Sequence, residues 1–535
     1  MLAAAGAAPR GSGNWLLPAL VLVPLIGGLL MLLTPYRLLR IAALGVSLVT
    51  FALSLVAAAA FEWDAAGAMQ LGASWSWVRD LGVSLGFAVD SVSLWLILLT
   101  AFLMPLTILG TWSDAQRRTT EFYLWLLVLE SALIGVFAAT DIILFYVFFE
   151  MTLVPLFFLI GIFGSANRLY AAYKFFVFTL AGSVFTLAGV IYVAWFAAHE
   201  SGVWTFDIPT LTAAAQQMNL TQQSWVLAAL LAGFAIKVPL FPVHTWLPLA
   251  HTEAPTAGSV ILAGVLLKLG SYGLYRLALP MAPHAVVEYA PAIAVLCIIG
   301  ILYAALICWV QTDLKRLVAY SSVSHMGFCI LGLFALNDAG VGGSVMYMIN
   351  HGLSTGALFL CVGMIYHRYH TRDMDEMSGL GRRMPVWGFF MVFFSLASVG
   401  LPGLNGFVSE FLTIFGAYRD DSPLGIGYAA VAALGLILGA IYILYMVGRV
   451  VYGPVKEPPE SAGHVHDLDW REITSLAPIA VACLVLGLYP TPLLRSFEPS
   501  IENVAGPART ILAEDRAGAE QIQLGARQLI IETLP

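Results

Sequence analysis

Residues 173–192 read YKFFVFTLAGSVFTLAGVIY, twenty positions of which only Lys174 carries a formal charge. A helix of about twenty largely apolar residues can cross the hydrocarbon core of a bilayer. The whole chain has the same character, because 60% of its 535 residues are hydrophobic and only 11% are charged. So few charges could not coat soluble domains, and disorder would require low hydrophobicity with high charge. The composition therefore predicts an all-α polytopic membrane protein.

The apolar runs predict fourteen spans. Their approximate ranges are 15–34, 38–60, 86–110, 120–139, 142–163, 173–197, 224–249, 256–279, 287–310, 316–335, 341–366, 386–415, 425–452 and 473–489. Two stretches outside the spans, residues 68–83 and the tail after Leu494, are amphipathic and are expected to lie at the membrane interface. Residues 205–224 are polar enough to predict a surface loop.

The positions of Lys and Arg predict the orientation. Fifteen of the 25 basic residues follow odd-numbered spans, eight lie at the termini or follow even-numbered spans, and Lys237 and Lys268 lie inside spans. Connections rich in basic residues stay on the cytoplasmic side of a membrane. Both termini are therefore expected on the non-cytoplasmic side, and the Ala- and Gly-rich spans favour a bacterial plasma membrane.

The stretch 173–192 has a second copy at residues 347–366, YMINHGLSTGALFLCVGMIY, and Thr140-Asp141 matches Thr312-Asp313 at nearly the same offset. The identical pairs are Tyr173/Tyr347, Gly182/Gly356, Phe185/Phe359, Gly189/Gly363, Ile191/Ile365 and Tyr192/Tyr366. Because the copies are spans 6 and 11, they must cross the membrane in opposite directions. This pattern predicts two inverted five-helix repeats, with chance matching of apolar residues as the alternative.

The predicted repeats divide the chain into four parts. Residues 1–119 hold spans 1–3 and the interfacial segment, 120–280 the first repeat, 281–453 the second repeat, and 454–535 span 14 with the amphipathic tail.

Each predicted repeat contains one interrupted span. Residues 236–242 in span 7 read IKVPLFP, and residues 400–406 in span 12 read GLPGLNG. Proline removes a backbone donor and clashes with the preceding turn. Irregular backbone at membrane depth is tolerated only beside protein or a water-filled cavity. Matching breaks in two inverted halves therefore indicate a transport site, and an ordinary proline kink is the alternative for either break alone.

Ionisable side chains inside the spans are the candidates for function, since a charge at the bilayer centre is costly unless it is paired or hydrated. Five formal charges lie there: Glu130, Glu150, Lys237, Lys268 and Glu410. His325 and His351 lie in spans 10 and 11. His244 and His251 follow Lys237 at seven-residue spacing, which places residues on one face of a helix.

Glu150 and Lys237 are predicted to form a switchable ion pair. Glu150 has apolar neighbours, so alone it would stay neutral, whereas a nearby Lys would hold it ionised. Lys237 lies beside the break in span 7 and is its natural partner. A static buried ion pair that joins two helices is the alternative.

Lys268 is predicted to carry protons. It lies deep in span 8 with no acidic residue within two turns, and desolvation favours its neutral amine. His325 and His351 can relay protons, although a satisfied core histidine is the simpler interpretation of either one alone. Glu410, just past the break in span 12, would accept the proton at the end of the series. Glu130 would be a second acidic partner or would join spans 4 and 5.

Several other classes of function are disfavoured. Sodium prefers clustered oxygens, and buried lysines would repel it, so protons fit the series best. The five cysteines lie in apolar runs without C-x-x-C spacing, which is typical of packing residues rather than of disulfides or metal ligands. We find no nucleotide-binding motif and therefore expect no cofactor in this chain. The net charge of −7 does not favour a nucleic-acid partner.

Three motifs carry a family resemblance. Residues 237–260 read KVPLFPVHTWLPLAHTEAPTAGSV, residues 267–273 read LKLGSYG, and residues 321–327 read SSVSHMG. Together they resemble the antiporter-like membrane subunits of respiratory complex I, the NADH:quinone oxidoreductase, over roughly residues 15–490. Glu410 favours the M-type members, since the L and N types and the Mrp-type cation antiporter subunits typically carry Lys there. The long lateral helix that extends the L type is not expected in this chain.

The resemblance implies roles and neighbours. It implies a switching role for the Glu150–Lys237 pair, a central proton site at Lys268 and a terminal site at Glu410, with the two buried histidines as relays. L-type and N-type subunits would flank the chain in a membrane arm, and partner subunits would bind NAD, FMN, iron–sulfur clusters and quinone. The expected function is proton translocation coupled to quinone reduction elsewhere in the complex. A cation/proton antiporter subunit and a structural scaffold are the alternatives.

Overall fold

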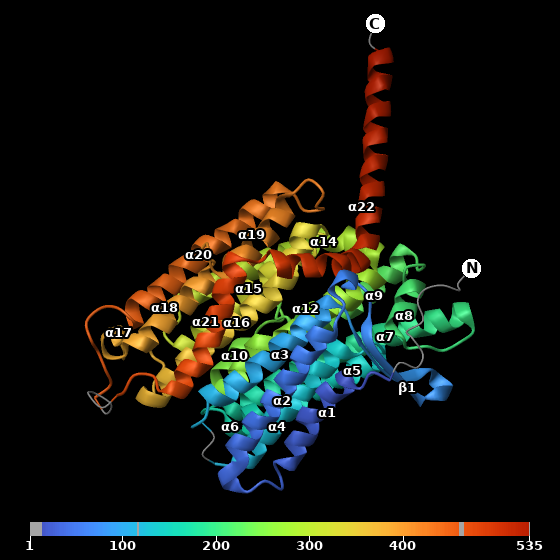
Figure 1. Ribbon diagram of the computed structural model, residues 1–535. Helices are drawn as coiled ribbons and strands as arrows, with labels where there is room; N and C mark the ends of the chain where they lie inside the picture. Colours follow the sequence, from blue (N-terminus) through green and yellow to red (C-terminus); the bar gives the residue numbers. More distant parts are fainter. Residues whose placement is uncertain (1–12, 115–116, 460–464, 534–535) are drawn as a thin grey trace.

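The computed structural model describes residues 13–114, 117–459 and 465–533, and most of them are helical. Ten helices within these ranges are long and apolar enough to cross a membrane. Figure 1 shows the helices packed side by side in one bundle, with the end of the C-terminal helix projecting away from it. Bounds of the longer helices are α1 (Leu16–Leu30), α2 (Leu39–Ala60), α3 (Ser91–Gly110), α4 (Thr119–Ala138), α5 (Ile142–Met151), α6 (Leu153–Phe163), α7 (Arg168–Ser201), α14 (Pro283–Trp309), α15 (Leu314–Leu333), α16 (Asp338–Tyr369), α20 (Ile426–Val450) and α21 (Trp470–Leu488).

The centre of the bundle consists of α16 and the continuous segment Thr256–Met281. This segment contains α11 (Thr256–Ile261), α12 (Leu267–Gly273) and α13 (Leu279–Met281), which are joined by π-helical turns at Leu262–Leu266 and Leu274–Ala278. Its most apolar window is entirely buried, and that of α16 is 94% buried. The side chains of these two elements therefore face protein rather than lipid.

Both interrupted spans consist of two helices with irregular backbone between them. In the first, α9 (Leu220–Lys237) ends at the lysine and α10 (Trp246–Glu253) begins nine residues later. In the second, α18 (Pro385–Val399) is followed by α19 (Asn405–Tyr418). Asn350 of α16 holds the second break, because its amide nitrogen donates to the Asn405 carbonyl at 2.7 Å. Buried side chains thus bind backbone groups beside the break.

The two matched Thr-Asp pairs occupy equivalent backbone settings. Asp141 caps α5 and forms an isolated β-bridge with Asp207, while Asp313 caps α15 and bridges Asp373. In both places the threonine carbonyl accepts a backbone hydrogen bond of 2.9 Å, from Ile208 in the first and from Met374 in the second.

The expectation that the chain is all-α is wrong in one place. Strand β1 (Gln70–Val78) pairs antiparallel with β2 (Val83–Val89), from Gln70 opposite Val89 to Val78 opposite Val83. Residues 71, 73, 75 and 77 are apolar and alternate with smaller or polar residues, which is the period of a strand. The predicted span 86–110 consequently begins later, at Ser91, where the Asp90 side chain accepts from the Ser93 amide.

The prediction of a surface loop over residues 205–224 is also wrong. It contains a short helix, α8 (Ile208–Ala215), and the first turn of α9. The Asp207 side chain caps α8 by accepting from the Thr210 amide, and Leu211 and Ala215 are completely buried. The apolar face of this helix packs against α7 and α13, which the overall polarity of the stretch conceals.

The tail after Leu494 is a helix that begins on the bundle. Helix α22 spans Thr491–Thr533, and its first part packs against α3, α13, α14 and α16. Ser500 bonds Ser91 at 2.8 Å, and Asn503 donates to the Gly67 carbonyl beside the hairpin at 2.9 Å. One face of this part of α22 therefore lies against protein, and its position at the membrane interface stays a prediction. Helix α17 (Leu380–Arg383) lies at the opposite end of the bundle (Figure 1).

Candidate functional site

Lys268 and His351 meet at the centre of the bundle. The lysine lies in α12 between the two π-helical turns, and its ammonium donates to the Ala263 carbonyl of the first turn. Its Nζ lies 2.8 Å from Nδ1 of His351, which α16 supplies. Lys268 is completely buried and His351 is 2% exposed. These two side chains can therefore exchange a proton without contact with bulk water.

A second group of hydrogen-bonded side chains continues from His351. The rings of His351 and His325 lie 5.8 Å apart between centroids. Nδ1 of His325 lies 2.8 Å from the hydroxyl of Tyr347, and that hydroxyl donates to Oε1 of Glu410 at 2.9 Å. His325 and Glu410 also approach each other directly, at 3.5 Å. Helices α15, α16 and α19 thus place a base, a hydroxyl and an acid in one row.

The proton positions in this row follow from the ionisation of Glu410. When Glu410 is a carboxylate, the Tyr347 hydroxyl donates to it and its oxygen accepts from Nδ1 of His325, which then carries a proton. Nε2 of His325 lies 3.2 Å from the Ser398 hydroxyl and can accept from it. The same residues line a cavity of about 10 Å³, which is close to the space that one water occupies. A neutral His325 therefore has a route for gaining a proton on one side and losing one on the other.

Glu150 and Lys237 lie close enough to interact electrostatically, but they are not in ion-pair contact. The Lys237 ammonium donates to Thr152 Oγ1 at 3.3 Å and lies 4.6 Å from the centre of the Phe149 ring. The Ser183 hydroxyl lies near Glu150 and donates to the Leu180 carbonyl at 2.9 Å. In this structure the two charged groups are therefore separated.

The end of α9 that carries Lys237 packs directly on the helix that carries Lys268. Gly270 allows this contact, since a Cβ atom there would lie 2.7 Å from the Phe234 carbonyl and 2.9 Å from the Val238 nitrogen. Lys237 is the last residue of α9, between these two contacts. A displacement of the pair can therefore reach α12 through backbone contact.

The remaining sequence-predicted residues lie outside the central row. His244 stacks on Phe241 and packs edge-on to Tyr303. His251 is completely buried and stacks on Phe359 at 4.6 Å. Within the part of the chain that the structure describes, neither ring nitrogen of His251 has a hydrogen-bond partner, and neither does either carboxyl oxygen of Glu130.

Sequence reasoning missed Tyr347 as a functional residue. Its signal is its position four residues before His351, which places both side chains on one face of α16. A tyrosine in an apolar span is common, so only the contact with Glu410 separates it from a packing residue. Thr152 was missed for a similar reason, since its role appears only when Lys237 reaches it from another helix.

The chemistry of this site is that of proton exchange between nitrogen and oxygen atoms. Among the described residues, no group of three or more His, Cys, Asp or Glu side chains could hold a metal ion. All five cysteines are buried and free. The row from Lys268 to Glu410 instead offers amine, imidazole, hydroxyl and carboxyl groups in sequence.

Comparisons with known proteins agree on one family. Residues 139–447 match the family described as NADH:quinone oxidoreductase/Mrp antiporter, transmembrane. NADH-quinone oxidoreductase subunit M of Rhodobacter capsulatus is 42% identical over 474 residues, which cover 86% of this chain and 89% of that protein. NADH-ubiquinone oxidoreductase chain 4 of Marchantia polymorpha is 40% identical over 492 residues, which cover 91% and 96% of the two chains.

A solved structure shows the same architecture. A chain of respiratory complex I from Thermus thermophilus with bound NADH superposes with a TM-score of 0.82 at 31% identity, over 92% of this chain and 99% of that chain. The expected resemblance is therefore confirmed, and the chain is a multi-pass membrane protein of a respiratory complex. It belongs to the NADH:quinone oxidoreductase/Mrp antiporter membrane family, in the group of subunit M and chain 4 proteins of complex I.

Proposed function

We propose that this chain translocates protons within a respiratory NADH:quinone oxidoreductase, along the row from Lys268 to Glu410. The observation that carries the proposal is the buried contact series Lys268–His351, His325–Tyr347 and Tyr347–Glu410, with heavy-atom distances of 2.8, 2.8 and 2.9 Å. Each step joins groups that can hold a proton or pass one on. Only the 5.8 Å between the two histidine rings needs a bridging water.

Proton movement begins at Lys268. As an ammonium it donates to Ala263 and to Nδ1 of His351. When its proton passes to His351, the amine becomes neutral and the imidazole becomes a cation. His351 then protonates His325 through water, and His325 releases its Nδ1 proton toward Tyr347 and Glu410. Glu410 receives the proton at the far end of the row.

The Glu150–Lys237 pair sets the charge beside Lys268. With the pair open, as here, the free ammonium of Lys237 disfavours a second positive charge nearby. Closure onto Glu150 would neutralise that ammonium and favour uptake of a proton at Lys268. Opening would then drive the proton toward His351. The close packing of α9 on α12 at Gly270 supports this coupling.

The architecture is proposed to comprise fourteen spans in two inverted repeats with both termini on the non-cytoplasmic side of a bacterial plasma membrane. Paired bridges at Asp141–Asp207 and Asp313–Asp373 support the repeat, as do the breaks after α9 and α18. L-type and N-type subunits would flank the chain. NAD, FMN, iron–sulfur clusters and quinone would be held by partner subunits, so that this chain moves protons without its own redox group.

Lys268→Ala tests the proposed function in the assembled complex. Inverted membrane vesicles are energised with NADH, and proton uptake is measured together with electron transfer. We expect the number of protons moved per electron to fall, because the central site is lost. Lys456→Ala, which removes an exposed lysine, is the matched control. An unchanged stoichiometry in Lys268→Ala, with the complex intact, would favour a scaffold role and overturn the proposal.

A further inference from the structure

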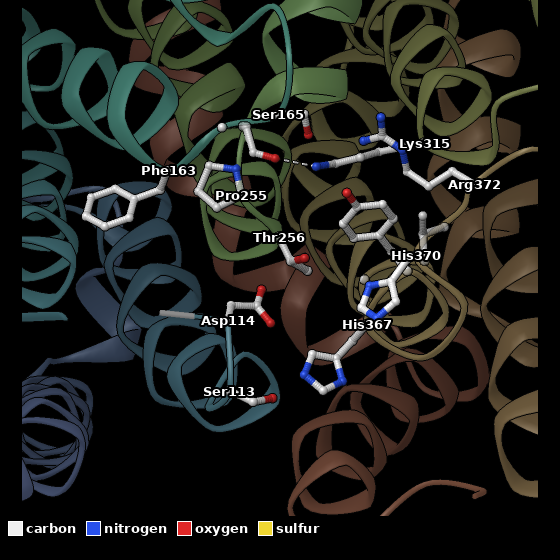
Figure 2. A pocket seen from close by; sticks show the side chains of 15 residues that line it. Ser113, Asp114, Phe163, Ser165, Pro255, Thr256, Lys315, His367, His370 and Arg372 are labelled. Carbon is white, nitrogen blue, oxygen red and sulfur yellow. Dashed lines mark hydrogen bonds between the residues drawn. The ribbon is translucent and has the colours of Figure 1, made fainter. Parts of the chain in front are cut away.

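Two hollows lie at the end of the bundle where α16 ends and α17 follows. Figure 2 shows the first, a cavity of about 290 Å³. Protein groups engage its lysine and its arginine, since Lys315 donates to the Ala254 carbonyl. Arg372 pairs with Asp313 at 3.3 Å. The second hollow is a groove of about 590 Å³ beside α18, and its basic side chain is not engaged in this way.

The groove runs along the outer side of α18. Its walls come from α18, from α17 and from the turn that follows α20, which packs against α18. The lining residues of α18 extend from Pro385 to Leu396, and among them Phe389 is 61% exposed. A helix rises about 16 Å over this distance, which is close to half of the hydrocarbon thickness of about 30 Å. The groove is therefore about as deep as one leaflet of a bilayer.

Arg382 of α17 lies at the surface end of the groove. It is exposed, and its guanidinium has no ion pair or hydrogen bond within the described ranges. The adjacent Arg383 differs, because it pairs with Glu457 at 3.4 Å. Tyr452, which is 59% exposed, lines the same end, and tyrosine is enriched where a membrane meets water. The mouth of the groove thus offers one uncompensated positive charge beside an interfacial ring.

The start of α18 adds no further attraction for an anion. Asp467 accepts from the backbone amides of Val386 at 2.8 Å and Trp387 at 3.1 Å, so a carboxylate already caps this helix. Arg382 is therefore the anion-binding group of the mouth, and a guanidinium can bind a phosphate through two hydrogen bonds. Its connection follows an odd-numbered predicted span, which predicts the cytoplasmic leaflet, where basic residues between helices bind anionic headgroups.

We propose that this groove binds an anionic phospholipid, with the phosphate on Arg382 and one acyl chain along α18 as far as Leu396. The lining matches such a molecule at each depth, with a cation at the mouth, a tyrosine at the interface and apolar side chains below. The acyl chain would end near Ser398, whose hydroxyl lies 3.2 Å from Nε2 of His325. Lipid binding is separate from the proposed proton transfer and can be measured without turnover.

A photoreactive residue tests what occupies the groove. p-Benzoylphenylalanine in place of Phe389 keeps an aromatic ring on the groove wall and, when illuminated, bonds to whatever lies beside it. The purified complex is placed in nanodiscs of equal parts dioleoyl phosphatidylglycerol, which is anionic, and dioleoyl phosphatidylcholine, which has no net charge. The mass of the cross-linked peptide identifies the lipid. We expect a preference of about fivefold for phosphatidylglycerol, the factor that corresponds to about 1 kcal/mol for one basic residue.

The two adjacent arginines provide a matched comparison. Arg382→Ala removes the uncompensated charge, so the preference for phosphatidylglycerol should disappear. Arg383→Ala removes a charge that Glu457 already neutralises, so the preference should remain. Val392→Trp places a larger side chain in the groove and should reduce the adducts of both lipids by about threefold. Native rates of NADH oxidation show that each variant complex is assembled, and the two arginine variants decide the question if Val392→Trp does not assemble.

The outcomes separate a lipid site from a subunit contact. A cross-link from position 389 to another polypeptide would show that protein fills the groove and would overturn the proposal. Equal adducts of the two lipids in the native complex would also overturn it, as would an equal loss of preference in both arginine variants. Loss in Arg382→Ala alone supports the site. Pumping by Lys268→Ala is a separate measurement, so either proposal can fail while the other stands.

Discussion

The proposed role of Tyr347 depends on its hydroxyl oxygen alone. Its hydroxyl is the bridge from His325 to Glu410, with contacts of 2.8 and 2.9 Å. Tyr347→Phe keeps the ring and removes the bridge, so we expect the rate of proton pumping to fall about tenfold, which is less than the roughly hundredfold or more that a positioned proton-transfer group typically contributes. The remaining 3.5 Å approach of His325 to Glu410 explains why some activity should persist.

The control for this change is Tyr275→Phe. Tyr275 is also fully buried, and its hydroxyl lacks a hydrogen-bond partner in the described residues. Pumping should survive this substitution. A Tyr347→Phe complex that pumps at the native rate would show that protons reach Glu410 without the hydroxyl.

Because charged residues are scarce in this chain, four residues of the row from Lys268 to Glu410 could be predicted from the sequence. Lys268, His325, His351 and Glu410 are ionisable groups in apolar spans, where they need a reason to be present. Contacts between residues that are distant in the sequence were harder to predict. The Glu150–Lys237 pair could be proposed from chemistry, but the hydrogen bond of Lys237 to Thr152 depends on how two helices meet.

At the scale of elements, the contact of α9 with α12 connects the ion pair to the central lysine. Gly270→Ala would place a Cβ atom 2.6 Å from Val238 Cγ2 and within 2.9 Å of two backbone atoms. Such overpacking typically costs about 1–3 kcal/mol. We expect a lower melting temperature of the purified complex and reduced pumping, because Lys237 moves relative to Lys268.

Gly439→Ala in α20 is the matched helical control, since nothing lies within 4 Å of its added Cβ. It should leave both stability and pumping near native levels. If Gly270→Ala matched this control in pumping, the proposed coupling through α9 and α12 would be wrong.

Structural elements could be predicted from the sequence where characteristic residue types mark them. Prolines and glycines gave the two helix breaks, because those residues disrupt the helical hydrogen-bond pattern. The hairpin β1–β2 is not predicted, because the alternation in residues 71–77 is short and is equally typical of an amphipathic stretch. Helix α8 was missed because its buried face has only a few residues, among them Leu211 and Ala215.

At the scale of the molecule, the distribution of charge makes a topological prediction. The proposed topology has nine crossings between Leu81 and Glu376, counting each broken helix as one: α3, α4, α5–α6, α7, α9–α10, α11–α13, α14, α15 and α16. An odd number would place the two residues on opposite sides, and the excess of basic residues in the connections after odd-numbered spans predicts that Glu376 is cytoplasmic. Single variants Leu81→Cys and Glu376→Cys can be probed with an impermeant maleimide, because the native cysteines are buried. Only Glu376→Cys should react in inverted vesicles, and only Leu81→Cys, which is 50% exposed, in spheroplasts. Reaction of both from one side would show an even number of crossings and remove the inverted repeat, while the reverse labelling would place both termini on the cytoplasmic side.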